Sequence, residues 1–278
     1  MSVRPRLKRL FSPSGKCLQV ALDHGVANDP SLLPGMENMR AVVNAVAPAN
    51  PDALLMTTGQ AHWLQDLPQR PKPALVARAD VPNFTAVPTP KQLFCVLIDQ
   101  VVEQALALDA ACMVVNLFWA SDEPDLHRQC VDNITRLKPQ CERYGMPLMI
   151  EPLVLIPDER GGFKTNSDIH KTVALARQSV ELGADIVKAD IAEHIDKYHL
   201  VVEAAMPRPL LPRGGARVPD QEILSRTYTL IQQGASGIVY GRNIYQHAHP
   251  ARMVRACQAV VHEGATVAQA MAILEGSK

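Results

Sequence analysis

Eight short apolar runs alternate with longer amphipathic stretches along this chain of 278 residues. The longer stretches repeat their apolar residues at helical spacing, whereas the short runs are typical of buried strands. This alternation indicates parallel strands joined by helical crossovers. Eight strand–helix units over about 250 residues predict an α/β fold of the (β/α)8 TIM-barrel type. The predicted strands are residues 17–22, 52–57, 74–78, 111–118, 147–153, 185–190, 209–215 and 236–243.

An open, doubly wound sheet is the alternative fold for such an alternation. That fold usually has fewer units and a G-x-G-x-x-G turn after its first strand, and the chain lacks this turn there. We therefore expect residues 1–278 to form one barrel domain that starts with a basic segment, residues 1–16. The predicted helices are residues 36–47, 93–108, 124–145, 167–183, 198–206, 219–234, 249–264 and 266–276.

The charge balance and the cysteine pattern restrict the partners and the compartment. The 28 basic and 28 acidic side chains cancel, which argues against a nucleic-acid or membrane partner because both favour a basic surface. No apolar run approaches the 18 residues of a membrane helix, and none of signal-peptide length follows the basic segment. The six cysteines form no C-x-x-C pair, so we expect free buried thiols in a cytoplasmic protein.

Polar residues stand at or just after the ends of the predicted strands. TIM barrels carry their chemistry at the carboxyl ends of the strands, so these residues are the functional candidates. They are Asp23, His24, Asn116, Glu151, Lys188, the turn Arg213-Gly214-Gly215 and the turn Gly241-Arg242-Asn243.

Lys188 stands between Val187 and Ala189 in the middle of a predicted strand. A lysine at a strand edge usually extends its ammonium group to solvent. Here the apolar neighbours favour a buried, inward lysine whose pKa is lowered, because burial disfavours the charged form. A neutral amine is a nucleophile that forms a Schiff base with a ketone or aldehyde, so Lys188 is the first catalytic candidate.

Glu151 is nearly as unusual, because carboxylates are rare inside apolar runs such as 147–153. It could pair with a neighbouring strand, for example with Lys188, or act as a general acid–base with a raised pKa. Asp23 and His24 end the first predicted strand. They could cap a helix and face solvent, or they could bind substrate hydroxyls and direct protons.

Gly214, Gly215, Gly241 and Arg242 follow the seventh and eighth predicted strands. Barrels often bind phosphate with the loops at these positions and the N-terminus of a short helix. Glycine lets backbone N–H groups approach phosphate oxygens closely, and a guanidinium suits the same group. The alternative is that these are ordinary turn residues. Arg213 is a further candidate for contacting an anion.

The sequence predicts neither a metal site nor a cofactor. The histidines show no metal-ligand spacing, and the pair His247 and His249 lacks the grouped acidic residues that a zinc site would need. Asn116 is a weaker candidate that could hydrogen-bond a substrate hydroxyl.

Several motifs together carry a family resemblance. They are "VALDHG", the lysine of "GADIVKAD", "RGG", and the segment from Gly234 to Ala270, in which "GRNIYQH" is quite specific. With them the chain resembles the DeoC/LacD and archaeal-type (DhnA-like) class I fructose-bisphosphate aldolase family over nearly its whole length. That family includes aldolases for fructose bisphosphate, tagatose bisphosphate and sulfofructose phosphate, and the autoinducer-2 phosphate thiolase.

The resemblance implies a TIM barrel with a Schiff-base lysine on strand six, which corresponds to Lys188. It further implies an aspartate on strand one, which corresponds to Asp23, and phosphate loops that correspond to Gly214-Gly215 and Gly241-Arg242. Members of the family often form large rings, so the resemblance implies a homo-oligomer.

Two features depart from the family pattern. Archaeal-type fructose-bisphosphate aldolases carry a tyrosine in a "YPRG"-like motif after strand five, where this chain has Glu151, as in the tagatose and sulfosugar branch. That branch tends to have a lysine on strand four, where this chain has Asn116. The strand-seven turn is commonly Ser-Gly-Gly, and Arg213 takes the place of the serine here.

We therefore expect a class I, metal-independent aldolase that cleaves or forms a C–C bond in a phosphorylated ketose or related keto sugar. Glu151 is the expected proton shuttle, assisted by Asp23. Two alternatives remain open. One is a thiolase-like or transaldol-type transferase acting on a phosphorylated diketone, and the other is a non-catalytic barrel that binds a phosphosugar.

Overall fold

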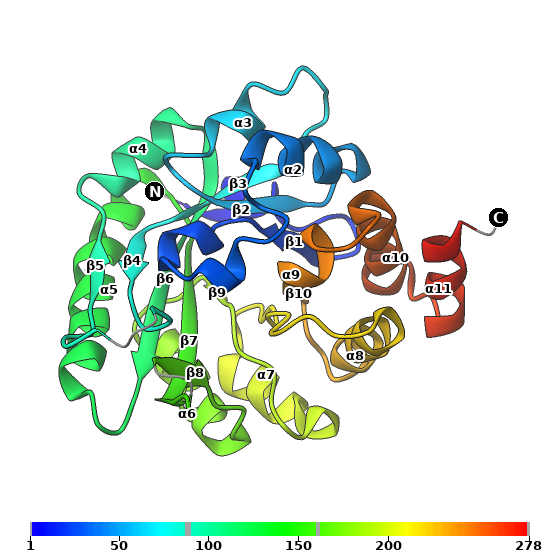
Figure 1. Cartoon of the computed structure of the whole chain (residues 1–278). Coiled ribbons are helices and arrows are strands. Elements are labelled where there is room, and N and C mark those ends of the chain that lie inside the picture. The colour runs from blue at the N-terminus through cyan, green and yellow to red at the C-terminus, as the bar shows by residue number, and fades with distance from the viewer. Residues whose placement is uncertain (1, 87–89, 160–161, 277–278) are drawn as a thin grey trace.

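The computed structural model describes residues 2–86, 90–159 and 162–276. Parallel strands lie in the order β10-β1-β2-β3-β6-β7-β9, with helices around them (Figure 1). This arrangement confirms the predicted α/β barrel and its parallel strands. The strands are β1 (Cys17–Ala21), β2 (Ala53–Thr57), β3 (Ala74–Arg78), β6 (Ala110–Trp119), β7 (Leu148–Pro157), β9 (Ile186–Val187) and β10 (Gly237–Tyr240).

The seventh side of the barrel is formed by segment 209–215, which was predicted to be a strand. It makes only two isolated parallel bridges, one to β9 and one to β10. The N–H of Leu211 donates to Val187 O at 2.8 Å, and the N–H of Val239 donates to Pro212 O at 2.9 Å. The segment therefore closes the ring between β9 and β10. Its two prolines have no N–H to donate, which explains why no continuous strand forms.

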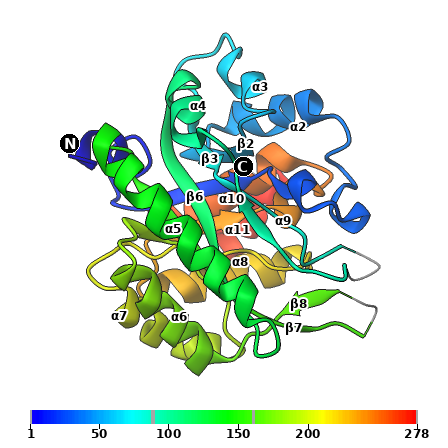
Figure 2. The ribbon, with the colours of Figure 1, turned by 90° about the vertical axis from the view of Figure 1, so that its left-hand side faces the viewer.

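Helices cover the outside of the strands, and Figure 2 shows α5 lying along β6. The longer helices are α2 (Met39–Val46), α4 (Val101–Ala107), α5 (Pro124–Tyr144), α6 (Ile169–Glu181), α7 (His199–Ala205), α8 (Asp220–Gln232), α10 (Pro250–Glu263) and α11 (Val267–Glu275). Shorter ones are α1 (Arg4–Leu7), α3 (His62–Gln65) and α9 (Arg242–Tyr245). Among the described residues, no helix is both long and apolar enough to cross a bilayer.

The helix predicted over 93–108 is wrong in its first half. Residues Cys95–Leu97 form β5, which pairs antiparallel with β4 (Asp80–Pro82). The helix α4 begins only at Val101, because Gln100 takes a left-handed conformation with φ 48°. Another short strand, β8 (Phe163–Thr165), pairs antiparallel with the last residues of β7.

Alternate residues of each strand face the interior of the barrel. Apolar side chains fill this interior as a core cluster distinct from the larger one between strands and helices. Two residues further along five of these strands, at the carboxyl end, the next side chain that faces inward is polar. The inward pairs are Ala21 and Asp23, Val76 and Arg78, Val114 and Asn116, Met149 and Glu151, and Ile186 and Lys188.

Residues 2–16 of the basic segment pack at the amino-terminal end of the barrel. Arg6 Nη1 donates to Ala110 O at 2.6 Å, and Arg9 pairs with Asp109 at 2.9 Å. Leu10 is fully buried in the interior cluster. The basic side chains therefore anchor this segment at the end of the barrel opposite to the polar strand ends. All six cysteines are buried and free, as the sequence predicts.

Candidate active site

Lys188 follows β9 directly and points into the carboxyl end of the barrel. Its backbone N–H donates to Ile150 O of β7 at 2.9 Å, which fixes the end of β9 against β7. The residue is 4% exposed, and its Nζ lies 2.9 Å from Glu151 Oε1. The lysine is therefore an interior residue, not one that extends to solvent from a strand edge.

Glu151 lies on β7, next to Asn116 of β6 in the strand register. Its two carboxylate oxygens have different partners. Oε1 faces Lys188, whereas Oε2 accepts a hydrogen bond from Arg78 Nη2 at 2.6 Å. The carboxylate is thus held between two cations from two different strands.

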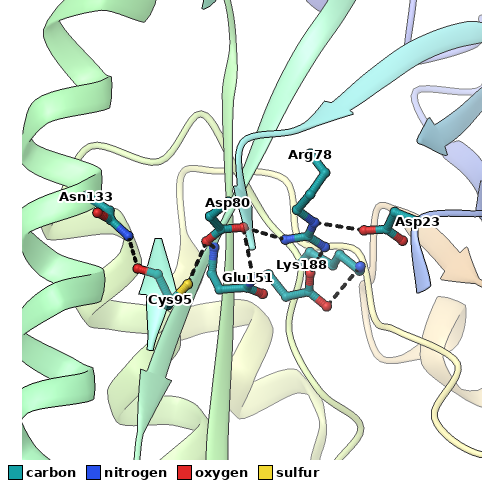
Figure 3. A network of polar contacts seen from close by, with 8 residues as sticks. Asp23, Arg78, Asp80, Cys95, Asn133, Glu151 and Lys188 are labelled. Atoms are coloured by element: carbon teal, nitrogen blue, oxygen red, sulfur yellow. Dashed lines mark hydrogen bonds and ion pairs between the residues drawn. The ribbon is translucent and has the colours of Figure 1, made fainter. Parts of the chain in front are cut away.

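Arg78, at the end of β3, links Glu151 to the first strand. Its Nε donates to Asp23 Oδ2 at 2.7 Å, and its Nη1 lies 3.4 Å from Asp80 Oδ1. Figure 3 shows the resulting row of charged side chains, from Asp23 through Arg78 and Glu151 to Lys188. These four buried residues come from four separate strand ends, so the barrel itself assembles the network.

The pKa of Lys188 is lowered, as the sequence predicts. Burial is the largest cause, because it disfavours the ammonium form, and the guanidinium of Arg78 acts in the same direction. Glu151 and Asp23 oppose the shift but do not cancel it. The site therefore favours the neutral, nucleophilic amine more than water does.

The raised pKa predicted for Glu151 is wrong. Burial alone would raise it, but the charges of Lys188, Arg78 and Arg213 together hold the pKa of this carboxyl well below its usual range. The pKa of Asp23 is lowered in the same way, since Arg78, Lys188 and His24 outweigh its burial. Both carboxyl groups are thus ionised at neutral pH.

Asp80 contacts the network through Arg78 and is itself held by neighbouring groups. Its Oδ2 accepts hydrogen bonds from Asn116 N at 2.7 Å and from Cys95 Sγ at 3.1 Å, and its Oδ1 accepts from Asn116 Nδ2 at 3.0 Å. The donor side of the Asn116 amide is therefore engaged within the protein. A contact of Asn116 with a substrate hydroxyl stays a prediction.

His24 packs against the Gly241 turn. A Cβ atom at Gly241 would lie 2.4 Å from His24 Cε1, so only glycine allows the ring to approach so closely. The ring also makes an edge contact with Tyr245 at a centroid distance of 5.3 Å. Burial, together with Lys188, Arg242 and Arg213, lowers the pKa of His24 to about 4 despite the neighbouring Asp23. The imidazole is therefore neutral at physiological pH.

The two predicted phosphate loops lie next to each other and are joined by Asn243. Its Oδ1 accepts from Val218 N at 3.0 Å, and its Nδ2 donates to Ala216 O at 3.1 Å. Gly215 has φ +66°, and a Cβ at Gly214 would lie 2.9 Å from Tyr240 Cδ1, so both positions need glycine. The loops thus form one rigid rim at this side of the barrel mouth.

Two guanidinium groups border this rim. Arg213 Nε lies 3.5 Å from Asp190 Oδ1, and burial followed by the charge of Arg213 lowers the pKa of Arg242. Among the described residues, the buried atoms without a hydrogen-bond partner include Arg242 Nε, His24 Nδ1 and Asp190 Oδ2. Unpartnered buried polar atoms are costly, and these three belong to residues that follow β10, β1 and β9 at the barrel mouth, where they are available to a bound group.

The structure brings together every residue that the sequence singled out at the strand ends. Asp23, Glu151 and Lys188 meet inside the barrel through Arg78. The loop candidates form the adjoining rim, against which His24 packs. Within the described ranges, no three His, Cys, Asp or Glu side chains gather in a way that could hold a metal ion.

Two residues of the network, Arg78 and Asp80, are not among the candidates that the sequence indicates. Arg78 and Asp80 were counted as part of the third strand and the residues after it, although two charged residues in "VARAD" are as unusual as Glu151. The same rule, polar residues at the end of an apolar run, would have found them.

Two curated relatives resemble this chain in sequence. An uncharacterized aldolase of Saccharolobus solfataricus is 30% identical in an alignment that covers 97% of this chain and 98% of that protein. A 3-hydroxy-5-phosphonooxypentane-2,4-dione thiolase of Photorhabdus laumondii is 29% identical, over 99% of this chain and 88% of that protein. These relatives match nearly the whole chain.

Solved structures show the same fold at lower identity. A fructose-bisphosphate aldolase from Slackia heliotrinireducens has a TM-score of 0.79 at 17% identity, with 99% of this chain and 92% of that chain covered. An archaeal fructose-1,6-bisphosphate aldolase, with its catalytic lysine bound to a carbinolamine intermediate, has a TM-score of 0.76 at 21% identity. The superposed residues cover 94% of this chain and 100% of the archaeal chain.

A family model settles the relationship. The model described as DeoC/LacD family aldolase matches residues 17–247, a range that includes the barrel strands, the charged network and both glycine loops. The chain belongs to the DeoC/LacD family of aldolases.

Proposed function

We propose that this protein is a class I aldolase that forms a Schiff base between Lys188 and a phosphorylated ketose or related keto compound. The observation that carries the proposal is the buried Lys188 amine, 2.9 Å from Glu151 and with a lowered pKa. A buried lysine is costly as a structural element, but it supplies the neutral nucleophile that imine formation needs.

The reaction follows from the chemistry of the imine. The amine adds to the keto carbon, and loss of water gives an iminium ion. The bond between the α and β carbons then breaks, its electron pair forms an enamine, and the β-hydroxyl proton passes to a base. Protonation of the enamine and hydrolysis release the second product and regenerate the amine.

Glu151 is the residue best placed to move these protons. In the iminium ion the lysine nitrogen is positively charged, and this charge is neutralised when the C–C bond breaks and the enamine forms. Glu151 then loses one of the cations that hold its pKa low, so its affinity for a proton rises as the β-hydroxyl proton is released. Asp23 is tied to Arg78 on the other side and would assist by keeping that arrangement in place.

The phosphate of the substrate would bind at the rim formed by Gly214, Gly215 and Gly241. Arg242 would contribute its guanidinium, whose Nε has no partner among the described residues. Arg213 would add a second positive charge between the rim and the lysine, since it acts electrostatically on both Glu151 and Arg242.

A thiolase-like transfer is the second candidate. It is favoured by the 29% identity, over nearly the whole chain, to relatives that are named 3-hydroxy-5-phosphonooxypentane-2,4-dione thiolase. The imine at Lys188 would be the same, but coenzyme A would accept the acyl group as a thioester. The enamine left on the lysine would then be protonated and hydrolysed as above.

The test is reductive trapping with cyanoborohydride, read by intact mass. The panel is fructose 1,6-bisphosphate, tagatose 1,6-bisphosphate, dihydroxyacetone phosphate and unphosphorylated fructose. A mass increase with a phosphorylated ketose, and a much smaller one with fructose, is the expected result. No adduct with any of them would leave a barrel that only binds its ligand. Incubation of the phosphorylated pentanedione with and without coenzyme A distinguishes the two candidates, because only the transfer forms an acyl thioester.

A further inference from the structure

We propose that Arg78 is a positioning residue of the imine chemistry: it holds Glu151 with one oxygen toward Lys188 and screens the lysine from the charge of the carboxylates. The inference rests on the proposed function, because it assigns a role in that same reaction. It concerns a residue that never touches Lys188 in the structure and acts through Glu151 and Asp23.

The guanidinium of Arg78 bridges two carboxylates, those of Asp23 and Glu151. A guanidinium is planar, always charged, and directs its N–H groups along fixed lines. Arg78 uses Nε for Asp23 Oδ2 at 2.7 Å and Nη2 for Glu151 Oε2 at 2.6 Å. Because Oε2 is fixed in this way, Oε1 is the oxygen that faces the amine, 2.9 Å away.

The barrel also holds the guanidinium of Arg78 in place. Arg78 lies at the end of β3, where the register pairs it with Thr57 of β2 and Val114 of β6. Its third nitrogen, Nη1, lies 3.4 Å from Asp80, which in turn is held by hydrogen bonds from Asn116 and Cys95. The side chain is 6% exposed, so its position is set by the barrel and not by solvent (Figure 3).

Arg78 also balances part of the negative charge around the Lys188 amine. The groups that act on Lys188 are Glu151 from β7, Asp23 after β1 and Arg78 from β3. His24, beside Asp23, is neutral at physiological pH because its pKa is about 4. Without Arg78, the lysine would lose the cation that opposes the two carboxylates most directly, and both carboxylates would favour the ammonium form more strongly. Arg213, which acts on Glu151, would remain. Arg78 therefore keeps the amine available for attack.

The experiment follows the rate of reductive trapping between pH 5 and pH 9, with dihydroxyacetone phosphate as the probe. It compares the wild-type protein with Arg78→Met and Arg78→Lys. Arg6→Met is the matched control, because Arg6 is also partly buried but donates to Ala110 at the opposite end of the barrel. Circular dichroism and Tm establish that each variant is folded.

Arg78→Met is expected to shift the pH of half-maximal trapping upward by about one unit or more, because the two carboxylates then act on the lysine without the charge of the Arg78 guanidinium. Arg78→Lys retains a cation but cannot span both carboxylates. It is expected to keep the wild-type midpoint and to trap at least about tenfold more slowly, since Glu151 is no longer held. Arg6→Met should match the wild type in both respects.

Each outcome decides the inference. A folded Arg78→Met variant with the wild-type midpoint overturns the screening role, and Arg78→Lys with the wild-type rate overturns the positioning role. If Arg78→Met does not fold, the Arg78→Lys rate still decides. Failure of the proposed function is seen separately, as the absence of a wild-type adduct with every probe at every pH.

Discussion

Lys188 Nζ and Glu151 Oε1 lie 2.9 Å apart, on side chains that are 6% and 7% exposed and that come from different strands. Such a buried pair is weak evidence for stability, because removing two charges from water costs about as much as their attraction returns. It is better evidence for chemistry, since the same burial that makes the pair costly lowers the pKa of the amine.

Replacement of Glu151 by glutamine removes the proton acceptor and keeps the shape of the side chain. We expect kcat to fall by about 10²–10⁴-fold, the usual contribution of a general acid–base. Substrate binding at the glycine rim should change little, because Glu151 lies inside the barrel. Steady-state kinetics with the best substrate of the trapping panel measures kcat and KM. A variant with wild-type kcat would assign the proton transfer to another group.

Arg242→Ala should raise KM for a phosphorylated substrate by about 10–100-fold, the value of one or two hydrogen bonds to a charged group. It should have a far smaller effect on an unphosphorylated ketose. Arg136→Ala, on the exposed face of α5, serves as the matched loss of an arginine. Equal effects of Arg242→Ala on both substrates would contradict a phosphate role.

Gly241→Ala tests the contact between the rim and His24. The new Cβ would lie 2.4 Å from His24 Cε1 and 3.2 Å from Ala21 O, so the ring has to move. We expect the free energy of unfolding to fall by about 1–3 kcal/mol, as for other overpacked sites. Gly59→Ala is the control, because nothing lies within 4 Å of its Cβ position. Urea titrations of both variants measure the difference, and equal stabilities would refute the close approach.

His24 should remain neutral from pH 8 down to pH 5. Its folded pKa of about 4 lies below the unfolded value of about 6.5, mainly because of burial. The neutral ring therefore adds stability that is complete above pH 6.5 and is lost as the pH falls through about 4. Ring nitrogen shifts in ¹⁵N-labelled protein report its protonation, with the urea-unfolded chain as the reference. A folded ring that titrates near 6.5 would contradict the environment described.

The sequence allowed the barrel and most of its polar strand ends to be predicted, since both follow from local patterns. The alternation of runs sets the strand order, and the two-residue period then directs Asp23, Glu151 and Lys188 inward. The β5 hairpin strand was not predicted, because the apolar spacing across 93–108 fits a helix equally well. Only the left-handed Gln100 interrupts it.

The sequence offers the pairing of Glu151 with Lys188 as one alternative, and the structure contains that pair. The contacts of Arg78 could not be predicted, because they depend on which strand ends are neighbours in space. Arg78 is 73 residues from Glu151 in the chain, and only the closed barrel brings their side chains together. Burial alone indicates a raised pKa for Glu151. The charge of Lys188, followed by those of Arg78 and Arg213, reverses this direction, so the raised pKa predicted from burial is wrong.

The central claim is that the reactive amine is that of Lys188. The most direct measurement is peptide mapping of the protein after cyanoborohydride trapping with a phosphorylated ketose, in parallel with Lys188→Arg, which retains the charge but cannot form an imine. We expect a reduced adduct on the peptide that contains Lys188, and neither adduct nor turnover in the variant. An adduct on a different lysine, or turnover retained by Lys188→Arg, would contradict it.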